Sequence, residues 1–192
     1  MQNKQGDERV EIRLAGEGGQ GMILAGIILA EAAAIYDGKN AIQTQSYGPE
    51  ARGGASKSEV IIGTGELDHP EVINADALVA LSQEACDKYA AVLKKNGVLI
   101  VDTEKVGRVP VNNAVKIPIT QIALEKTGKT ITTNVVALGI VVALTHVVSR
   151  EAIKKAVLAR APKGTEEINR IALQAGFEEA ERVAPSLAKA RE

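Results

Sequence analysis

The chain has 192 residues, of which 45% are hydrophobic and only 2% aromatic, so its core must be largely aliphatic. This length favours a single domain over residues 1–192, with a core at about residues 11–182. A formal net charge of -1 without a run of like charges argues against binding to nucleic acid or an anionic membrane. One cysteine, Cys86, excludes an internal disulfide and an iron–sulfur cluster, which needs several thiolates.

The N-terminal residues and the most apolar stretch bear on the location of the protein. Polar residues continue through Arg9, and we therefore expect no signal peptide and a cytoplasmic location. Residues 131–148 are apolar overall but include polar side chains, and their length is marginal for spanning a bilayer. We interpret this stretch as a buried helix.

The first third of the chain alternates predicted strands with glycine-rich loops. A strand at residues 10–15 runs directly into Gly16-Glu17-Gly18-Gly19-Gln20-Gly21, and a helix rich in Ala and Leu follows at 22–35. A second strand is predicted at 41–45. It precedes a turn-rich segment, and a third strand follows at 60–62.

The remainder of the chain contains buried strands and then helices. Residues 83–95 are predicted to form an amphipathic helix that Asn96-Gly97 closes as a C-terminal cap. Ser149 and Thr165 stand where helix N-caps belong, and the residues beyond Pro185 are predicted to be a frayed tail or a docking arm. Further strands are predicted at 77–81, 98–101 and 114–117, and further helices at 120–126, 133–148, 151–159 and 166–182.

Strands that alternate with helices predict the fold class. We expect an α/β fold, a three-layer Rossmann-like sandwich with a mostly parallel sheet and a helical C-terminal part. Ligands bind such sheets at the carboxyl ends of the strands. Because both glycine-rich segments follow predicted strands, they should share that edge.

The first glycine segment has the spacing of a nucleotide-binding loop. Gly16, Gly18 and Gly21 lie between a strand and a helix, where backbone N–H groups suit a phosphate or a carboxylate. The alternative is that they only form a tight turn. A dinucleotide site also needs an acidic residue at the end of the second strand, but this strand ends at Gln43-Thr44-Gln45, and Asp37 precedes it. Nicotinamide binding is therefore disfavoured.

The second glycine segment is too specialised for an ordinary connection. It reads Tyr47-Gly48-Pro49-Glu50-Ala51-Arg52-Gly53-Gly54, with a fixed torsion at Pro49 and three permissive glycines. Arg52 suits a bidentate contact with a carboxylate or phosphate. The alternative for Arg52 is a structural ion pair with Glu50 or another acid of the chain.

The two glycine segments together resemble the gamma subunit of pyruvate, 2-oxoglutarate and ketoisovalerate ferredoxin oxidoreductases. The resemblance continues through residues 56–62, 75–81 and 134–139, and it spans about residues 11–144. Ala51 stands where members of this family often carry a larger residue such as Met, which changes little.

This resemblance implies a function that the residues alone do not. Enzymes of the family oxidatively decarboxylate a 2-oxoacid to an acyl-CoA and reduce ferredoxin. Thiamine diphosphate, magnesium and iron–sulfur clusters are expected in partner subunits named alpha, beta and, where present, delta, with ferredoxin contacted indirectly. This chain is expected to be a subunit of the oxidoreductase, inactive alone, that supports assembly and the coenzyme A side of the site. The sequence does not identify the 2-oxoacid: pyruvate, 2-oxoglutarate, branched-chain oxoacids and indolepyruvate all stay open, with 2-oxoglutarate slightly favoured.

A set of cofactor-binding residues follows from the two segments, with no catalytic or metal-ligating residue among them. The set comprises Gly16, Gly18, Gly19, Gln20, Gly21, Tyr47, Arg52, Gly53 and Gly54. Two alternatives stay open. One is a free-standing Rossmann-type nucleotide-binding dehydrogenase, and the other is a pure assembly module that binds no small molecule.

We make a separate prediction for each of five further residues. His69 is predicted in a surface turn, His146 in the core or at a helix end, and Cys86 as a small buried hydrophobic residue. Asp102 either serves as a functional acid or caps the turn after its strand. Asn134 needs a hydrogen-bond partner, either at the glycine-loop edge or on a neighbouring subunit.

Overall fold

The central sheet contains six strands in the order β2-β3-β1-β4-β5-β6. The computed structural model describes residues 9–47, 55–111 and 114–190. All strands run parallel except β3, which is antiparallel to both of its neighbours, so the predicted mostly parallel sheet is confirmed. The strands are β1 (Arg9–Glu17), β2 (Asn40–Ser46), β3 (Ala55–Gly63), β4 (Ala75–Ala80), β5 (Leu93–Asp102) and β6 (Val115–Ile117).

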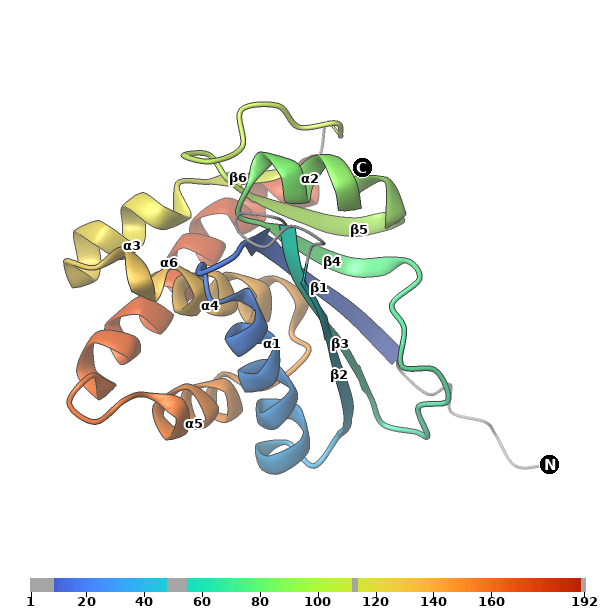
Figure 1. Cartoon of the computed structure of the whole chain (residues 1–192), viewed down its shortest axis with the longest axis horizontal. Coiled ribbons are helices and arrows are strands. Elements are labelled where there is room, and N and C mark those ends of the chain that lie inside the picture. The colour runs from blue at the N-terminus through green and yellow to red at the C-terminus, as the bar shows by residue number, and fades with distance from the viewer. Residues whose placement is uncertain (1–8, 48–54, 112–113, 191–192) are drawn as a thin grey trace.

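Helices cover both faces of this sheet (Figure 1). In β4, Ala77 and Val79 face the core beneath α1 and the C-terminal helices, whereas Leu78 and Ala80 face α2. Two sets of apolar residues on alternate positions therefore produce the predicted three-layer sandwich. The helices are α1 (Met22–Glu31) with a π-helical extension (Ala32–Tyr36), α2 (Gln83–Tyr89), α3 (Ile119–Thr127), α4 (Thr133–Thr145), α5 (Arg150–Arg160) and α6 (Glu166–Ala190), with single 3-10 turns at Ala90–Val92 and Thr130–Thr132.

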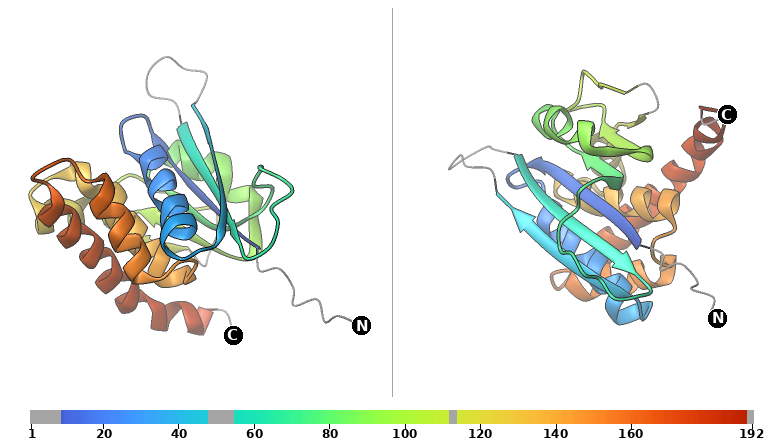
Figure 2. Two further views of the ribbon diagram at one scale, coloured as in Figure 1. Left: turned by 90° about the horizontal axis from the view of Figure 1, so that it is seen from below. Right: turned by 90° about the vertical axis from the view of Figure 1, so that its right-hand side faces the viewer.

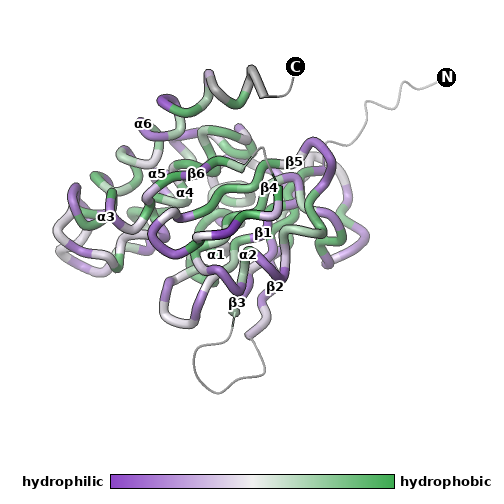
Figure 3. The backbone as a smooth tube through the Cα atoms, turned by 90° about the horizontal axis from the view of Figure 1, so that it is seen from above, coloured by the Kyte–Doolittle hydropathy of each residue, from purple (hydrophilic) through white to green (hydrophobic). Residues whose placement is uncertain are grey.

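The helical C-terminal part is centred on the buried helix α4. Hydrophobic residues gather in the central strands and in this helix, and hydrophilic ones lie on the outer loops and helix surfaces (Figure 3). A Cβ on Gly139 would lie 2.5 Å from the Leu173 carbonyl oxygen, and one on Gly176 would lie 2.2 Å from that of Val136. The backbones of α4 and α6 therefore touch. Within the described residues, no helix has the length and apolarity needed to cross a bilayer.

A buried ion pair joins β1 to β3 on the face that α2 covers. Arg13 Nε donates to Glu59 Oε1 at 2.7 Å, and Arg13 Nη2 donates to the Val72 carbonyl at 2.7 Å. Lys57 Nζ lies 2.9 Å from the second oxygen of Glu59, and the Arg13 guanidinium lies 5.3 Å from the Tyr89 ring centre. Each buried charge thus has several partners, which offsets the cost of removing it from water.

The predicted helix at residues 83–95 is wrong in its C-terminal half. Helix α2 ends at Tyr89, and the residues from Leu93 to Gly97 belong to β5. Ala75 pairs with Leu93 while Ala77 pairs with Val98, so β5 bulges between these pairs. A Cβ on Gly97 would lie 2.8 Å from Leu93 Cγ, which means that this glycine permits close packing in the bulge instead of capping a helix.

Of the two predictions for the residues beyond Pro185, the frayed tail is wrong through Ala190, and the docking arm stays a prediction. Helix α6 continues through Pro185 to Ala190. Val183 and Leu187, four positions apart, both pack against the main core. Tertiary packing of this apolar stripe therefore carries the helix past the proline.

Candidate functional site

The first glycine loop lies where the sheet changes its direction of winding. From β1 the chain passes through α1 to the β2 side of the sheet, whereas from β4 it passes through α2 to β5 on the other side. Because α1 and α2 cover opposite faces, a crevice opens at the carboxyl ends of β1 and β4. The glycine loop forms one wall of this crevice.

Both glycine segments start from the same edge of the sheet, as predicted. Gly16 pairs with Ser56 in β3, and Ser46 pairs with the adjacent Lys57. Tyr47 follows at this edge with its side chain 68% exposed. Arg52, Gly53 and Gly54 lie outside the described residues, so their proposed roles stay predictions.

Two glycines of the loop have backbone conformations that other residues rarely adopt. Gly19 has φ 93° and Gly21 has φ 73°. Gly21 is also the N-cap of α1, where no side chain caps the helix. A Cβ on Gly21 would lie 2.6 Å from Asn134 Nδ2, so both conformation and space require glycine here.

The amide of Gln20 makes its hydrogen bonds within the protein. Its Oε1 accepts from the Glu17 N–H at 2.7 Å, and its Nε2 donates to the Leu81 carbonyl at 2.9 Å. Gln20 thereby joins the ends of β1 and β4 across the crevice. A Cβ on Gly16 would collide with Gln20 Oε1, which explains the glycine at that position.

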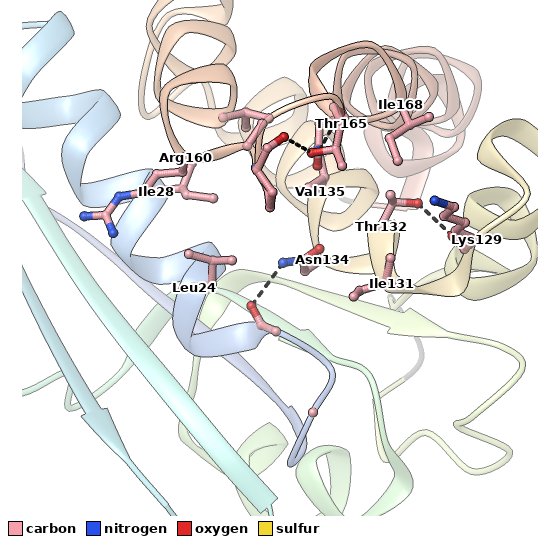
Figure 4. Close-up of a pocket in the computed structure, with 16 residues that line it drawn as sticks. Leu24, Ile28, Lys129, Ile131, Thr132, Asn134, Val135, Arg160, Thr165 and Ile168 are labelled. Atoms are coloured by element: carbon pink, nitrogen blue, oxygen red, sulfur yellow. Dashed lines mark hydrogen bonds between the residues drawn. The ribbon is translucent and has the colours of Figure 1, made fainter.

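Asn134 connects the buried helix α4 to the glycine loop (Figure 4). Its Nδ2 donates to the Gly21 carbonyl at 3.3 Å, and the residue is 5% exposed. The first of the two partners considered for Asn134, the glycine-loop edge, is therefore confirmed. The bond sets the distance between α4 and the start of α1.

Two cavities of about 400 Å³ each share Gly19 and Ile131; one opens at the crevice, and the other lies between α1, α4, α5 and α6. The polar cavity is lined by Glu17, Lys105 and the threonines at 120, 130 and 133. The second cavity is largely apolar, with Asn134 and Lys129 among its polar residues (Figure 4). Ile131 is 78% exposed where the two cavities meet. Together they suit an elongated ligand with one polar and one apolar part.

Positive side chains outnumber negative ones in the two cavity linings, with Lys105, Lys129 and Arg160 against Glu17. Within the described residues, neither Lys105 nor Lys129 has an ion-pair partner, whereas Arg160 at the apolar cavity is bound by Glu31. The hydrogen bonds and negative charge of Glu31 raise the pKa of Arg160. The N-termini of α1 and α4 also lie at the crevice and contribute partial positive charge, and the Thr133 N–H at the start of α4 bonds to the Thr130 carbonyl.

Asp102 has the capping role, one of the two roles considered for it. The carboxylate is fully buried and accepts from the Thr120 N–H at 3.1 Å, from the Thr120 hydroxyl, and from the Glu104 N–H at 3.1 Å. It therefore holds the start of α3 and the turn after β5. That turn places Lys105 in the polar cavity.

Lys105 and Lys129 belong to neither of the glycine segments from which the site residues were predicted. Lys105 follows the carboxyl end of β5, and a residue placed there in a parallel sheet is a recognisable signal. Lys129 precedes the 3-10 turn before α4, and no sequence pattern indicates that this connection reaches the glycine loop. Only the packing of α4 brings it there.

The remaining individual expectations mostly agree with the structure. Cys86 is buried, and burial together with the charge of Asp87 raises the pKa of its thiol. His69 lies in an exposed loop, and His146 ends α4 with φ 53°; it is exposed and not in the core. Among the residues that the structure describes, no group of three or more His, Cys, Asp or Glu could hold a metal ion.

The strand order does not provide the usual dinucleotide geometry. In that geometry the second strand lies next to the first, and an acidic residue at its end faces the glycine loop. Here β3 separates β2 from β1, and β2 ends at Ser46 without an acid. This arrangement argues further against a nicotinamide dehydrogenase.

Comparison with known proteins identifies the family. The model of the pyruvate ferredoxin/flavodoxin oxidoreductase family matches residues 11–179. The chain belongs to this family. The chain is 54% identical over 175 residues to the 2-oxoglutarate synthase subunit KorC of Methanocaldococcus jannaschii, covering 88% of this chain and 93% of that subunit.

Two further family members extend the comparison. Pyruvate synthase subunit PorC of Methanothermobacter thermautotrophicus is 33% identical over 185 residues, covering 91% of this chain and 97% of that subunit. The crystal structure of a keto/oxoacid ferredoxin oxidoreductase gamma subunit from Geobacter sulfurreducens is similar with a TM-score of 0.84 and 55% identity, covering 91% of this chain and 98% of that one. The resemblance noted in the sequence is therefore confirmed.

Proposed function

We propose that this chain is the gamma-type subunit of a 2-oxoglutarate:ferredoxin oxidoreductase, and that its glycine-loop crevice forms part of the coenzyme A site. The enzyme oxidatively decarboxylates 2-oxoglutarate, transfers the succinyl group to coenzyme A and passes the electrons to ferredoxin. The chemistry belongs to partner subunits. The isolated chain is inactive.

The choice of 2-oxoglutarate over pyruvate rests on the relatives. Identity is 54% to a 2-oxoglutarate synthase subunit and 33% to a pyruvate synthase subunit. The reconstituted complex should therefore reduce ferredoxin faster with 2-oxoglutarate than with pyruvate. A preference for pyruvate would contradict the assignment.

The form and charge of the crevice support a coenzyme A role. Coenzyme A combines anionic phosphates with a long and largely apolar pantetheine arm. The polar cavity suits the phosphates, since Lys105 there has no ion-pair partner in the described part of the chain, and the adjoining apolar cavity suits the arm. The shared boundary at Gly19 and Ile131 lets one ligand occupy both. This pairing of cavities is the observation that carries the proposal.

The cofactors of the reaction are placed in partner subunits. The only cysteine, Cys86, is buried and cannot hold an iron–sulfur cluster by itself. We therefore assign thiamine diphosphate, magnesium and the clusters to alpha, beta and delta subunits, with ferredoxin docking on one of these partners.

A lysine substitution tests the coenzyme A role in the reconstituted complex. Lys105→Ala should raise the KM for coenzyme A about fivefold to tenfold, because a charge-assisted contact with phosphate is lost. The KM for 2-oxoglutarate and the kcat at saturating coenzyme A should stay unchanged. Lys116→Ala removes an exposed lysine from β6, outside both cavities, and should leave all three constants unchanged.

Two results would favour the alternatives. An unchanged KM for coenzyme A in Lys105→Ala, together with weaker subunit association, would indicate a pure assembly module. Calorimetric titration of the chain with NADH should show no binding heat, and a micromolar affinity would instead indicate a nucleotide-binding dehydrogenase. Tyr47 lines neither cavity, so its predicted contact with the ligand, like that of Arg52, does not carry this proposal.

A further inference from the structure

The two edges of the sheet differ in their protection against pairing with another strand. At one edge, β6 has only three residues and carries Lys116 at its centre. Short length and a charged side chain are both devices that prevent a sheet from extending into another molecule. This edge is therefore protected.

The opposite edge, formed by β2, lacks such protection (Figure 2). Its seven residues, Asn-Ala-Ile-Gln-Thr-Gln-Ser, include no charge and no proline. It pairs with β3 in continuous register from Asn40 to Ser46, so no bulge twists the edge away. Within the described residues, no further strand pairs with its outer side. Natural sheets rarely leave an edge of this kind open to water.

We infer that β2 is an interface between two copies of this chain, paired antiparallel across a two-fold axis into one continuous sheet. Full overlap of the two strands places Gln43 opposite its own counterpart and Gln45 opposite Ala41. An identical strand would pair with the backbone N–H and C=O groups on the outer side of β2, because the amides of Asn40 and Gln43 already donate within the chain. The net charge of -1 per chain gives little repulsion between copies.

Exposed apolar groups at the two ends of β2 favour a second copy over an unrelated strand. Tyr47, which follows β2, is 68% exposed. Ile35 and Tyr36, on the π-helical turn that packs against β2 shortly before the strand, are 66% and 38% exposed. An antiparallel two-fold pairing brings the Tyr47 end of one copy to the Tyr36 end of the other, twice in each dimer.

Sedimentation of the purified full chain tests the pairing. Its mass should rise from 20.2 kDa toward twice that value as concentration increases. Gln45→Lys, at an exposed position of β2, should raise the dimer dissociation constant about tenfold because each dimer then carries two charged side chains on the paired strands, a feature that resists edge pairing. Gln121→Lys makes the same change on the exposed surface of α3 and should leave dissociation unaltered.

Disulfide cross-linking tests the register. In an antiparallel pair, opposite Cα atoms lie about 4.5–5.5 Å apart, within the range of a disulfide. Gln43→Cys should therefore yield a covalent dimer under mild oxidation, since the native Cys86 is buried. Thr44→Cys should not yield a covalent dimer, because in the same register Thr44 faces Ile42 of the other copy.

Three outcomes would overturn the inference. One is a chain that sediments as a monomer at every concentration. Another is an equal effect of Gln45→Lys and Gln121→Lys. The third is protection of the β2 amides from hydrogen exchange only after partner subunits are added, which would assign this edge to a strand of another subunit.

Discussion

At the scale of single residues, the polar groups around the crevice divide into those that hold the protein together and those that are free. Gln20, Asn134 and Asp102 each make hydrogen bonds within the chain, and they position the glycine loop, α4 and the turn after β5. Lys105 and Lys129 have no ion-pair partner within the described residues. The first group shapes the site, and the second is available to a ligand.

Burial of the Cys86 thiol predicts that the free energy of unfolding depends on pH. Burial and the neighbouring Asp87 raise its pKa above the ordinary 9.0 in the folded state only. The unfolded chain therefore loses this proton first as the pH rises, and the free energy of unfolding should fall above about pH 9. The contribution of this thiol to stability is complete below its pKa in the unfolded chain. It is lost as the pH rises through its pKa in the folded protein.

Denaturant unfolding of the wild type and Cys86→Ala between about pH 7.5 and pH 10.5 measures this effect. The difference in unfolding free energy between the two proteins should shrink at the alkaline end, because the variant lacks the titrating group. Parallel curves for the two proteins across this range would contradict the prediction.

At the scale of elements, the helical part depends on contact between the backbones of α4 and α6. Gly139 and Gly176 face each other, and a Cβ on either would lie closer than 3 Å to backbone atoms of the other helix. Backbone cannot move aside as a flexible side chain can. The two glycines therefore set the distance between these helices.

Gly176→Ala should lower the free energy of unfolding by about 3 kcal/mol, because overpacking outweighs the better helix propensity of alanine. Chemical denaturation monitored by circular dichroism gives the value. Gly107→Ala is the matched control, since a Cβ there meets no atom within 4 Å, and it should change stability by less than about 0.5 kcal/mol. Equal stability of the two variants would exclude the close contact.

At the scale of the whole molecule, the site depends on a junction between two halves of the sheet. The chain winds away from β1 and β4 in opposite directions, and Gln20 bonds to backbone groups on both sides of that junction. Among the described residues, Gln20 joins these two strand ends through one side chain. The form of the crevice should therefore depend on this amide.

Gln20→Ala should lower the free energy of unfolding by about 1–3 kcal/mol and speed amide exchange at Glu17, because the partly buried Leu81 carbonyl and the exposed Glu17 N–H lose their side-chain partner. Hydrogen exchange and denaturant unfolding measure both effects. Gln174→Ala removes an exposed amide that bonds only to Glu178 on α6 and should be nearly neutral. A similarly small effect of both substitutions would show that Gln20 does not hold the junction.

Local sequence patterns were sufficient to predict many structural features of this protein. The alternating strands and helices, the loop from Gly16 to Gly21 and the cap at Ser149 follow from residues close together in the chain. The sequence by itself therefore determined the fold class, the family and the edge where the site lies. These features depend on torsions, hydrophobic periods and short motifs.

Only the tertiary structure decided the features that join distant segments. Leu93 to Gly97 carry a helical composition but form part of β5, because pairing with β4 outweighs local preference. The insertion of β3 between β2 and β1, and the approach of Lys105 and Lys129 to one crevice, likewise depend on contacts far apart in the chain. Such contacts carry no local signal, since their free energy arises only when the whole sheet and its helices are packed.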